Sequence, residues 1–184
     1  MMDSPVKPIA VVQGAESAAV QQLLRDFVSR RQASLRIAGV IEEVSDLSGR
    51  ACGAGRLLNI VDGSGHMLFQ ELGKGSDACS LDPTGVVLAG EAARRDILAG
   101  CDLAVLSKFG KLEAENGSGL MGAFVAAMEV NAPILTSVSP RFASAWKAFA
   151  APLFVTLPAN AGAIDEWWEA ISRGSVELCY SSVA

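Results

Sequence analysis

The sequence has few of the residues that build metal or redox sites. It contains one histidine, His66, and four cysteines, no two of which have C-x-x-C spacing. Structural zinc usually needs four soft ligands in close pairs, so we expect no metal site, although Cys52, Cys79 and His66 could meet in space. Cys79 lies in a predicted loop before a helix, where a thiol can become reactive. An inert thiol is the simpler interpretation.

Charged residues are also scarce, and the net negative charge disfavours binding to nucleic acid. Charged residues make up 19% of the 184-residue chain, the net charge is −5 and the isoelectric point is about 4.9. Binding to a phosphate backbone requires clustered Lys and Arg, so the composition argues against nucleic acid as a partner. Hydrophobic residues make up 51% of the chain, which excludes a largely disordered protein.

No segment has the composition of a membrane-spanning helix. Mean hydropathy is +0.34, but the longest charge-free run, at residues 148–164, contains Pro152 and Pro158 and divides into shorter pieces. The N-terminus carries Asp3 and two prolines, and it lacks the apolar core of a signal peptide. We therefore expect a cytoplasmic protein with no membrane insertion.

The chain instead alternates short apolar runs with helical patterns. Strands are expected at residues 8–13, 36–44, 56–61, 66–72, 101–107, 133–138 and 153–157, and helices at 17–31, 82–99, 120–130, after Ser139 and after Asn160. Such alternation is typical of a parallel sheet covered on both faces, and residues 62–65 predict a hairpin turn. We predict one α/β domain over 1–174, with a doubly wound, mainly parallel sheet and a small β-hairpin insertion, and a tail of uncertain order over 175–184.

Ligands of such folds bind at the carboxyl ends of the strands. The loops to consider are therefore those at residues 14–17, 73–82, 107–119 and 138–141. Gln13 and Gly14 end the first strand, where the backbone could approach a ligand or simply turn. Asp82 precedes Pro83 and is expected to cap a helix, to which a ligand role would be additional.

Two lysines follow the strand at 101–107. Lys108 and Lys111 could bind an oxyanion or a nucleotide phosphate, or they could be solvated and paired with Glu113 and Glu115. Glu113 could act as a general base or orient Lys108, or it could lie on a helix surface. The Gly-Ser-Gly sequence around Ser118 could expose N–H groups to an anion at a helix start, or it could form a plain connection.

Two stretches are distinctive: ACSLDP at residues 78–83, and SKFGKLEAENGSGL at residues 107–120, followed by APILTSV. They resemble a bacterial family of uncharacterised proteins related to nucleoside triphosphatases and commonly found in the company of molybdate-transport proteins. The order of elements, hairpin included, is similar to the thermophilic nucleoside-triphosphatase family. The resemblance covers residues 9–171 and implies a P-loop-derived fold without assigning a reaction.

The sequence departs from the P-loop pattern at the groups that carry its chemistry. A phosphate-binding loop reads G-x-x-x-x-G-K-[ST], in which the Lys meets phosphate and the hydroxyl holds Mg²⁺. The corresponding stretch is GAESAAVQ, so Ala19, Val20 and Gln21 occupy the Gly, Lys and hydroxyl positions. Glu16 adds negative charge there, and the Walker B strand ends at Ser107 rather than at a carboxylate. Ordinary P-loop hydrolysis is therefore not expected.

These observations predict a non-catalytic or weakly catalytic accessory protein that binds a small anion, an oxyanion or a nucleotide. The link to molybdate is implied by the resemblance alone. One alternative is a divergent nucleoside triphosphatase in which Lys108 or Lys111 replaces the P-loop lysine. Another is a protein-interaction module, because Trp167 and Trp168 are adjacent: we expect Trp146 and one of them in the core, and the other exposed or at an interface. No cofactor or catalytic residue is assigned, and a homo-oligomer is left open.

Overall fold

Strands and helices alternate along the computed structural model, which describes residues 6–45, 54–71 and 79–181. The strands are β1 (Ile9–Gln13), β2 (Ile37–Ser45), β3 (Ala54–Asn59), β4 (Gly65–Met67), β5 (Phe69–Glu71), β6 (Cys79–Leu81), β7 (Leu103–Phe109), β8 (Ile134–Val138) and β9 (Phe154–Pro158). The helices are α1 (Ser17–Arg31), α2 (Pro83–Leu98), α3 (Lys111–Asn116), α4 (Met121–Glu129), the 3₁₀ turn η1 (Pro140–Phe142), α5 (Ala143–Ala150) and α6 (Ala161–Ser181).

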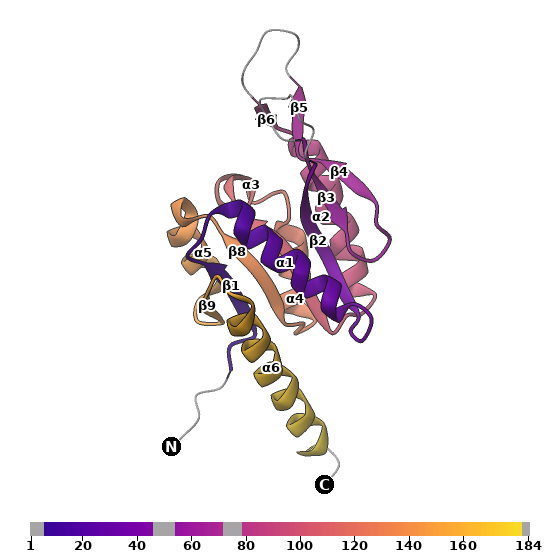
Figure 1. Ribbon diagram of the computed structural model, residues 1–184, viewed down its shortest axis with the longest axis vertical. Helices are drawn as coiled ribbons and strands as arrows, with labels where there is room; N and C mark the ends of the chain where they lie inside the picture. The colour runs from indigo at the N-terminus through magenta and orange to yellow at the C-terminus, as the bar shows by residue number, and fades with distance from the viewer. Residues whose placement is uncertain (1–5, 46–53, 72–78, 182–184) are drawn as a thin grey trace.

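Seven of these strands form one sheet, in the order β4-β3-β2-β7-β8-β1-β9 (Figure 1). The strands from β2 to β9 in this order run parallel, whereas β3 and β4 are antiparallel additions at one edge. The remaining strands, β5 and β6, form a separate antiparallel pair. The predicted α/β fold with a doubly wound, mainly parallel sheet is confirmed, and it is consistent with a P-loop-like architecture.

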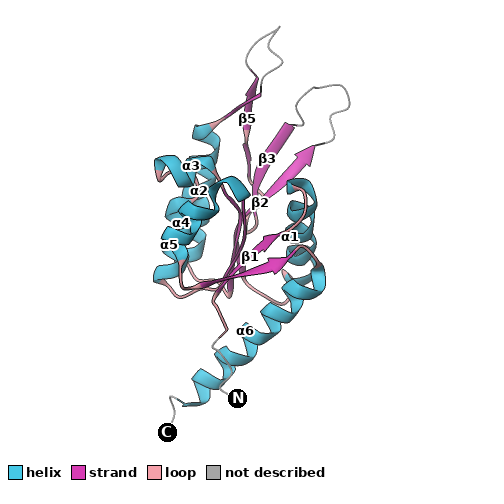
Figure 2. Cartoon of the chain, turned by 90° about the vertical axis from the view of Figure 1, so that its left-hand side faces the viewer, coloured by secondary structure: helices cyan, strands magenta, loops and turns pink. Residues whose placement is uncertain are grey.

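Helices cover both faces of the sheet (Figure 2). On one face α1 and α6 bury Phe27, Trp167 and Trp168 against the strands. On the other face, α2 to α5 enclose a second core that contains Phe109 and Trp146, whose ring centroids lie 5.1 Å apart in an edge-on arrangement. Burial on both faces explains why the central strands consist almost entirely of apolar residues.

Helix boundaries follow the local signals in the sequence. The Asp82 carboxylate accepts a hydrogen bond from the Thr84 N–H at 3.0 Å, and Pro83 is the first residue of α2. The Asn160 side chain accepts one from the Ala163 N–H at 2.8 Å and caps α6. Because a cap satisfies N–H groups that the helix itself leaves unpaired, these positions could be predicted without tertiary information.

The hairpin differs from the prediction in its second strand. The expected strand at 66–72 is divided at Leu68, which is 8% exposed and donates its N–H to the Gly55 carbonyl at 3.0 Å. Burial of Leu68 turns the chain, so β4 extends the main sheet while β5 pairs with β6. Cys79 accordingly begins a strand rather than lying in a loop, and its side chain is outside the described residues.

The three tryptophans are all buried within the chain, so the expectation that one indole is exposed or at an interface is wrong. Trp146, Trp167 and Trp168 are 2%, 5% and 7% exposed. The Trp167 indole N–H donates to the Lys7 carbonyl at 2.9 Å, which allows this polar group to be buried. The helix that carries Trp167 continues through Ser181, past residue 174. Among the described residues, no helix is long and apolar enough to cross a membrane.

Two glycines let α2 approach other main-chain segments closely. A Cβ atom on Gly85 would lie 2.2 Å from the Met67 carbonyl oxygen, and one on Gly90 would lie 2.3 Å from the Gly119 carbonyl oxygen. A larger side chain at either position would force main-chain atoms apart. The position of α2 between the hairpin and the loop before α4 therefore depends on these two residues.

Gly90→Ala should destabilise the protein even though alanine is the better helix former. Overpacking a tight contact costs about 1–3 kcal/mol, which exceeds the helix-propensity gain of about 1 kcal/mol. Gly122→Ala, also in a helix, is the matched control, because its nearest neighbour is the flexible Arg94 side chain at 3.4 Å. Chemical denaturation should show a loss for the first variant and no loss for the second. Equal stabilities would contradict the close contact at Gly90.

Candidate functional site

A crevice lies at the carboxyl ends of β1, β7 and β8. The chain leaves β1 into α1 on one face of the sheet and leaves β8 into η1 and α5 on the other, which is the arrangement at which doubly wound folds bind ligands. A cavity of about 110 Å³ opens there, lined by Gln13, Gly14, Ser17, Lys108 and Ser139 among others. The sequence predicted three of these residues, Gln13, Gly14 and Lys108, as site residues.

An extra residue in β7 determines where Lys108 points. Leu106 pairs with Thr136 of β8, but Phe109 pairs with Val138, so the register shifts by one residue between them. Leu106 and Phe109 both belong to the core on the α2 to α5 face. Strict alternation along the strand would also direct Lys108 to that face. A β-bulge reverses this direction and turns Lys108 toward α1.

The Lys108 ammonium donates a hydrogen bond to the Ser17 hydroxyl at 3.0 Å. Ser17 is the first residue of α1, where unpaired N–H groups and the helix dipole favour negative charge. A cation is therefore held at an anion-favouring helix terminus, although the P-loop lysine position is occupied by Val20. Glu16 precedes Ser17 and makes no side-chain capping hydrogen bond to the helix.

Below Ser17, the Gln21 amide joins α1 to two strands. Its Nε2 group donates to the Ser107 carbonyl at 2.9 Å and to the Ser137 hydroxyl at 3.2 Å. The Ser137 hydroxyl in turn donates to the same carbonyl at 2.8 Å. Gln21 is only 1% exposed, and its carbonyl oxygen has no hydrogen-bond partner within the described part of the chain. In the P-loop pattern this position carries the hydroxyl that binds the metal ion. Here it carries Gln21, whose amide donates hydrogen bonds to protein oxygens.

Glu113 is a buried structural carboxylate, so its predicted place on a helix surface is wrong. It is 5% exposed, and its two oxygens accept hydrogen bonds from the Gly110 N–H at 2.9 Å and the Leu120 N–H at 2.7 Å. These bonds close α3 and fix the start of α4. The apolar pattern does not predict α3, although one interpretation placed Glu113 on a helix, because the six residues are held by this carboxylate rather than by an apolar repeat.

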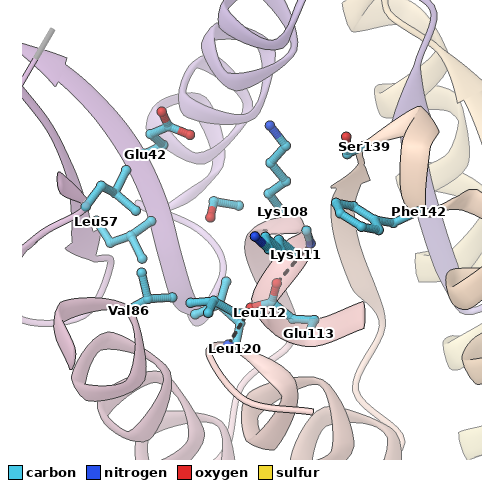
Figure 3. Close-up of a pocket in the computed structure, with 13 residues that line it drawn as sticks. Glu42, Leu57, Val86, Lys108, Lys111, Leu112, Glu113, Leu120, Ser139 and Phe142 are labelled. Carbon is cyan, nitrogen blue, oxygen red and sulfur yellow. Dashed lines mark hydrogen bonds between the residues drawn. The ribbon is translucent and has the colours of Figure 1, made fainter. Parts of the chain in front are cut away.

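A larger cavity, of about 240 Å³, adjoins the crevice and shares Lys108 and Ser139 with it (Figure 3). Glu42, Ser107, Lys111 and Glu113 also line it, together with six apolar side chains. In Figure 3, Lys108 lies between Leu57 and Val86 on one side and Phe142 on the other. The cavity is thus mainly apolar, and of its two lysines Lys108 also lines the crevice.

The other predicted site residues lie at different distances from the crevice. Lys111 lines the larger cavity and lies 4.0 Å from Glu115 in an exposed ion pair, as one of the two sequence interpretations expected. Ser118 donates its N–H to the Leu112 carbonyl at 3.1 Å, and the neighbouring Gly117 N–H bonds to the Glu113 carbonyl. These N–H groups are thus paired within the chain, which favours the plain connection over the anion site, the two interpretations of the sequence around Ser118. Asp82 caps α2 outside both cavities as described.

Ser17 and Ser139 lie in loops that the sequence indicated, at 14–17 and 138–141, but were not named as site residues, and Gln21 and Ser137 were not assigned to the site at all. Ser17 and Gln21 are four residues apart, so they share one face of α1, and this spacing was a signal available in the sequence. The bulge that brings Lys108 to this face leaves no trace in the residue pattern. Elsewhere, burial raises the pKa of the Cys101 thiol, which favours the inert form of that residue.

Substitutions at Gln21 should separate the loss of its hydrogen bonds from the effect of a negative charge introduced at the same buried position. Gln21→Leu loses two hydrogen bonds worth about 1 kcal/mol each but also removes an unpaired buried oxygen that costs about 1–3 kcal/mol, so stability should change by less than about 1 kcal/mol. Gln21→Glu places a carboxylate against the Ser107 carbonyl and should cost about 3–5 kcal/mol at neutral pH. Urea denaturation measures both. A tolerated glutamate would contradict the buried geometry.

Comparison with known proteins gives one relative and one family. Molybdenum import ATP-binding protein ModC 2 of Bradyrhizobium diazoefficiens is 33% identical over 148 residues, which are 79% of this chain but 16% of that protein. The chain therefore spans about a sixth of the curated relative it matches. No solved structure matches the chain. The model of the family described as "Protein of unknown function (DUF2478)" matches residues 9–167, and the chain belongs to this family.

Proposed function

We propose that this protein binds a small phosphate-bearing or oxyanion ligand in the crevice between β1, β7 and β8, and acts as an accessory protein without ordinary P-loop hydrolysis. The observation that carries the proposal is the Lys108 ammonium, 3.0 Å from the Ser17 hydroxyl at the start of α1. A fixed cation, a hydroxyl and a helix N-terminus all favour the same kind of ligand, an anion.

The group that would bind a metal ion in a P-loop site is replaced here by Gln21. Its amide donates to the Ser107 carbonyl and the Ser137 hydroxyl, so these oxygens are already paired. We therefore expect the negative charge of the ligand to be balanced by the Lys108 ammonium rather than by Mg²⁺. Binding should be insensitive to replacement of Mg²⁺ by EDTA, and this feature distinguishes the proposal from a working triphosphatase.

The curated relative suggests a biological setting. Its printed name describes an ATP-binding protein of molybdenum import, and this chain corresponds to about a sixth of it. We extend the proposal accordingly: the protein works in the cytoplasm beside a molybdenum importer, and its ligand is either the imported oxyanion or a nucleotide. Molybdate, tungstate, phosphate and ATP are therefore the first ligands to test.

A divergent nucleoside triphosphatase is the second candidate, because Lys108 stands at the start of α1 in place of the missing lysine. The carboxylate nearest in sequence, Glu113, is unsuited to activate water, since both of its oxygens accept backbone N–H groups. Mg²⁺-dependent phosphate release that disappears in Lys108→Ala would favour this candidate over a binding protein. Ligand binding without phosphate release would favour the first.

Lys108→Ala should weaken anion binding by at least about tenfold, because a hydrogen bond to a charged group contributes about 1.5–3 kcal/mol. Lys111→Ala is the matched control: Lys111 also lines the larger cavity but pairs with Glu115 and is 65% exposed, so a smaller loss is expected. Calorimetry with molybdate, phosphate and ATP measures both. Equal losses of affinity in the two variants would indicate that the anion binds closer to Lys111 than we propose. If none of these ligands binds the wild-type protein, the proposal is refuted.

Glu16→Gln should strengthen anion binding modestly. One charge at a helix terminus contributes about 0.3–1 kcal/mol at low salt, and Glu16 makes no capping hydrogen bond to α1. The substitution should leave the free energy of unfolding within about 0.5 kcal/mol of wild type. Titration of both proteins with one anion at low ionic strength tests this. Weaker binding by the variant would identify Glu16 as a ligand contact and contradict the argument.

A further inference from the structure

The two cavities together suggest a ligand larger than a bare oxyanion. They measure about 240 Å³ and 110 Å³ and share Lys108 and Ser139. Each is smaller than the roughly 300 Å³ at which typical small-molecule sites begin. Because Lys108 and Ser139 line both, the two cavities are neighbours, and a ligand that reaches past Lys108 can occupy both.

The walls of the larger cavity are unsuited to an inorganic anion. They come from the hairpin, α2, α3, the start of α4 and η1, and their apolar members are Leu57, Leu68, Val86, Leu112, Leu120 and Phe142. An oxyanion placed against these side chains would lose its hydration without gaining hydrogen bonds. An apolar or aromatic group would instead gain from leaving water. The cavity thus favours the organic part of a ligand.

Charge is distributed unevenly around this cavity. Lys108 stands between it and the crevice, and the Glu42 carboxylate lies across from Phe142, on the side of β2 (Figure 3). The Lys108 ammonium can meet an anionic group at the junction, while Glu42 can accept a hydrogen bond from an N–H or O–H group on the ligand body. Phe142 offers a ring for stacking, and the Arg141 guanidinium lies 5.6 Å from its centroid.

We infer that the ligand is an organic phosphate whose flat ring system occupies the larger cavity while its phosphate contacts Lys108. This inference rests on the proposed function and narrows it, because it selects a phosphate ester over a bare oxyanion. Phe142 would be a specificity residue for the ring, and Lys108 would serve the anion alone. These two roles can be separated experimentally.

The deciding measurement compares inorganic phosphate with phenyl phosphate, and then with AMP, by calorimetry on the intact chain. Phenyl phosphate adds only a ring, so the affinity ratio reports the contribution of the larger cavity. We expect phenyl phosphate to bind at least about tenfold more tightly, since burial of one aromatic ring exceeds the 1.4 kcal/mol that a factor of ten requires. AMP should bind at least as tightly as phenyl phosphate.

Two variants assign the effect to the cavity. Phe142→Ala should remove most of the advantage of phenyl phosphate and leave inorganic phosphate unchanged, whereas Lys108→Ala should weaken both. Phe149→Ala is the matched control, because it removes a nearby ring that is absent from the described lining of the cavity. Thermal melts establish whether each variant is folded. If Phe142→Ala is unfolded, the ratio of the wild-type affinities for phenyl phosphate and inorganic phosphate decides alone.

The outcomes distinguish this inference from the proposed function. Equal affinities for phenyl phosphate and inorganic phosphate, both lost in Lys108→Ala, would overturn the inference and leave an oxyanion-binding protein. A preference for phenyl phosphate that survives Phe142→Ala but disappears in Phe149→Ala would also overturn it, because the ring would lie elsewhere. Failure of all three ligands and of molybdate to bind would overturn both proposals.

Discussion

The amide of Gln21 is the contact on which the geometry of the crevice depends. Its two N–H groups hold the first turns of α1 to the carbonyl of Ser107 and the hydroxyl of Ser137. Ser17 lies one turn earlier on the same face of α1, so this anchor also fixes the hydroxyl that receives Lys108. In a P-loop, phosphate and metal connect the helix to the strand ends. Here protein groups make that connection themselves.

The fold was largely predictable because its signals are local. Asp82 and Asn160 cap helices through their own side chains, and the apolar strands are long enough to be recognised in isolation. The departures arise where a distant contact determines the local structure. Burial of Leu68 divides one expected strand, and the Glu113 carboxylate organises a helix that has no apolar repeat.

The place of the candidate site in the fold followed from the sequence, but the contacts within it did not. The carboxyl ends of parallel strands meet at one edge, which was sufficient to select Gln13, Gly14 and Lys108. The direction of Lys108 depends on one extra residue in β7 relative to β8, and a register shift is a property of two strands rather than of either sequence. For the same reason Ser137, from β8, could not be connected with Gln21 beforehand.

The close contacts of α2 affect how the lining of the larger cavity can change among related proteins. Gly85 and Gly90 place α2 against the carbonyl groups of Met67 and Gly119, and Val86 projects into the cavity between these two contacts. The position of the wall that α2 forms is thus set by main-chain contacts at these two glycines rather than by the size of its lining side chain. In relatives that keep both glycines, α2 should hold its place when the lining side chains change, so that the chemistry of the cavity can vary while this part of its frame keeps its dimensions.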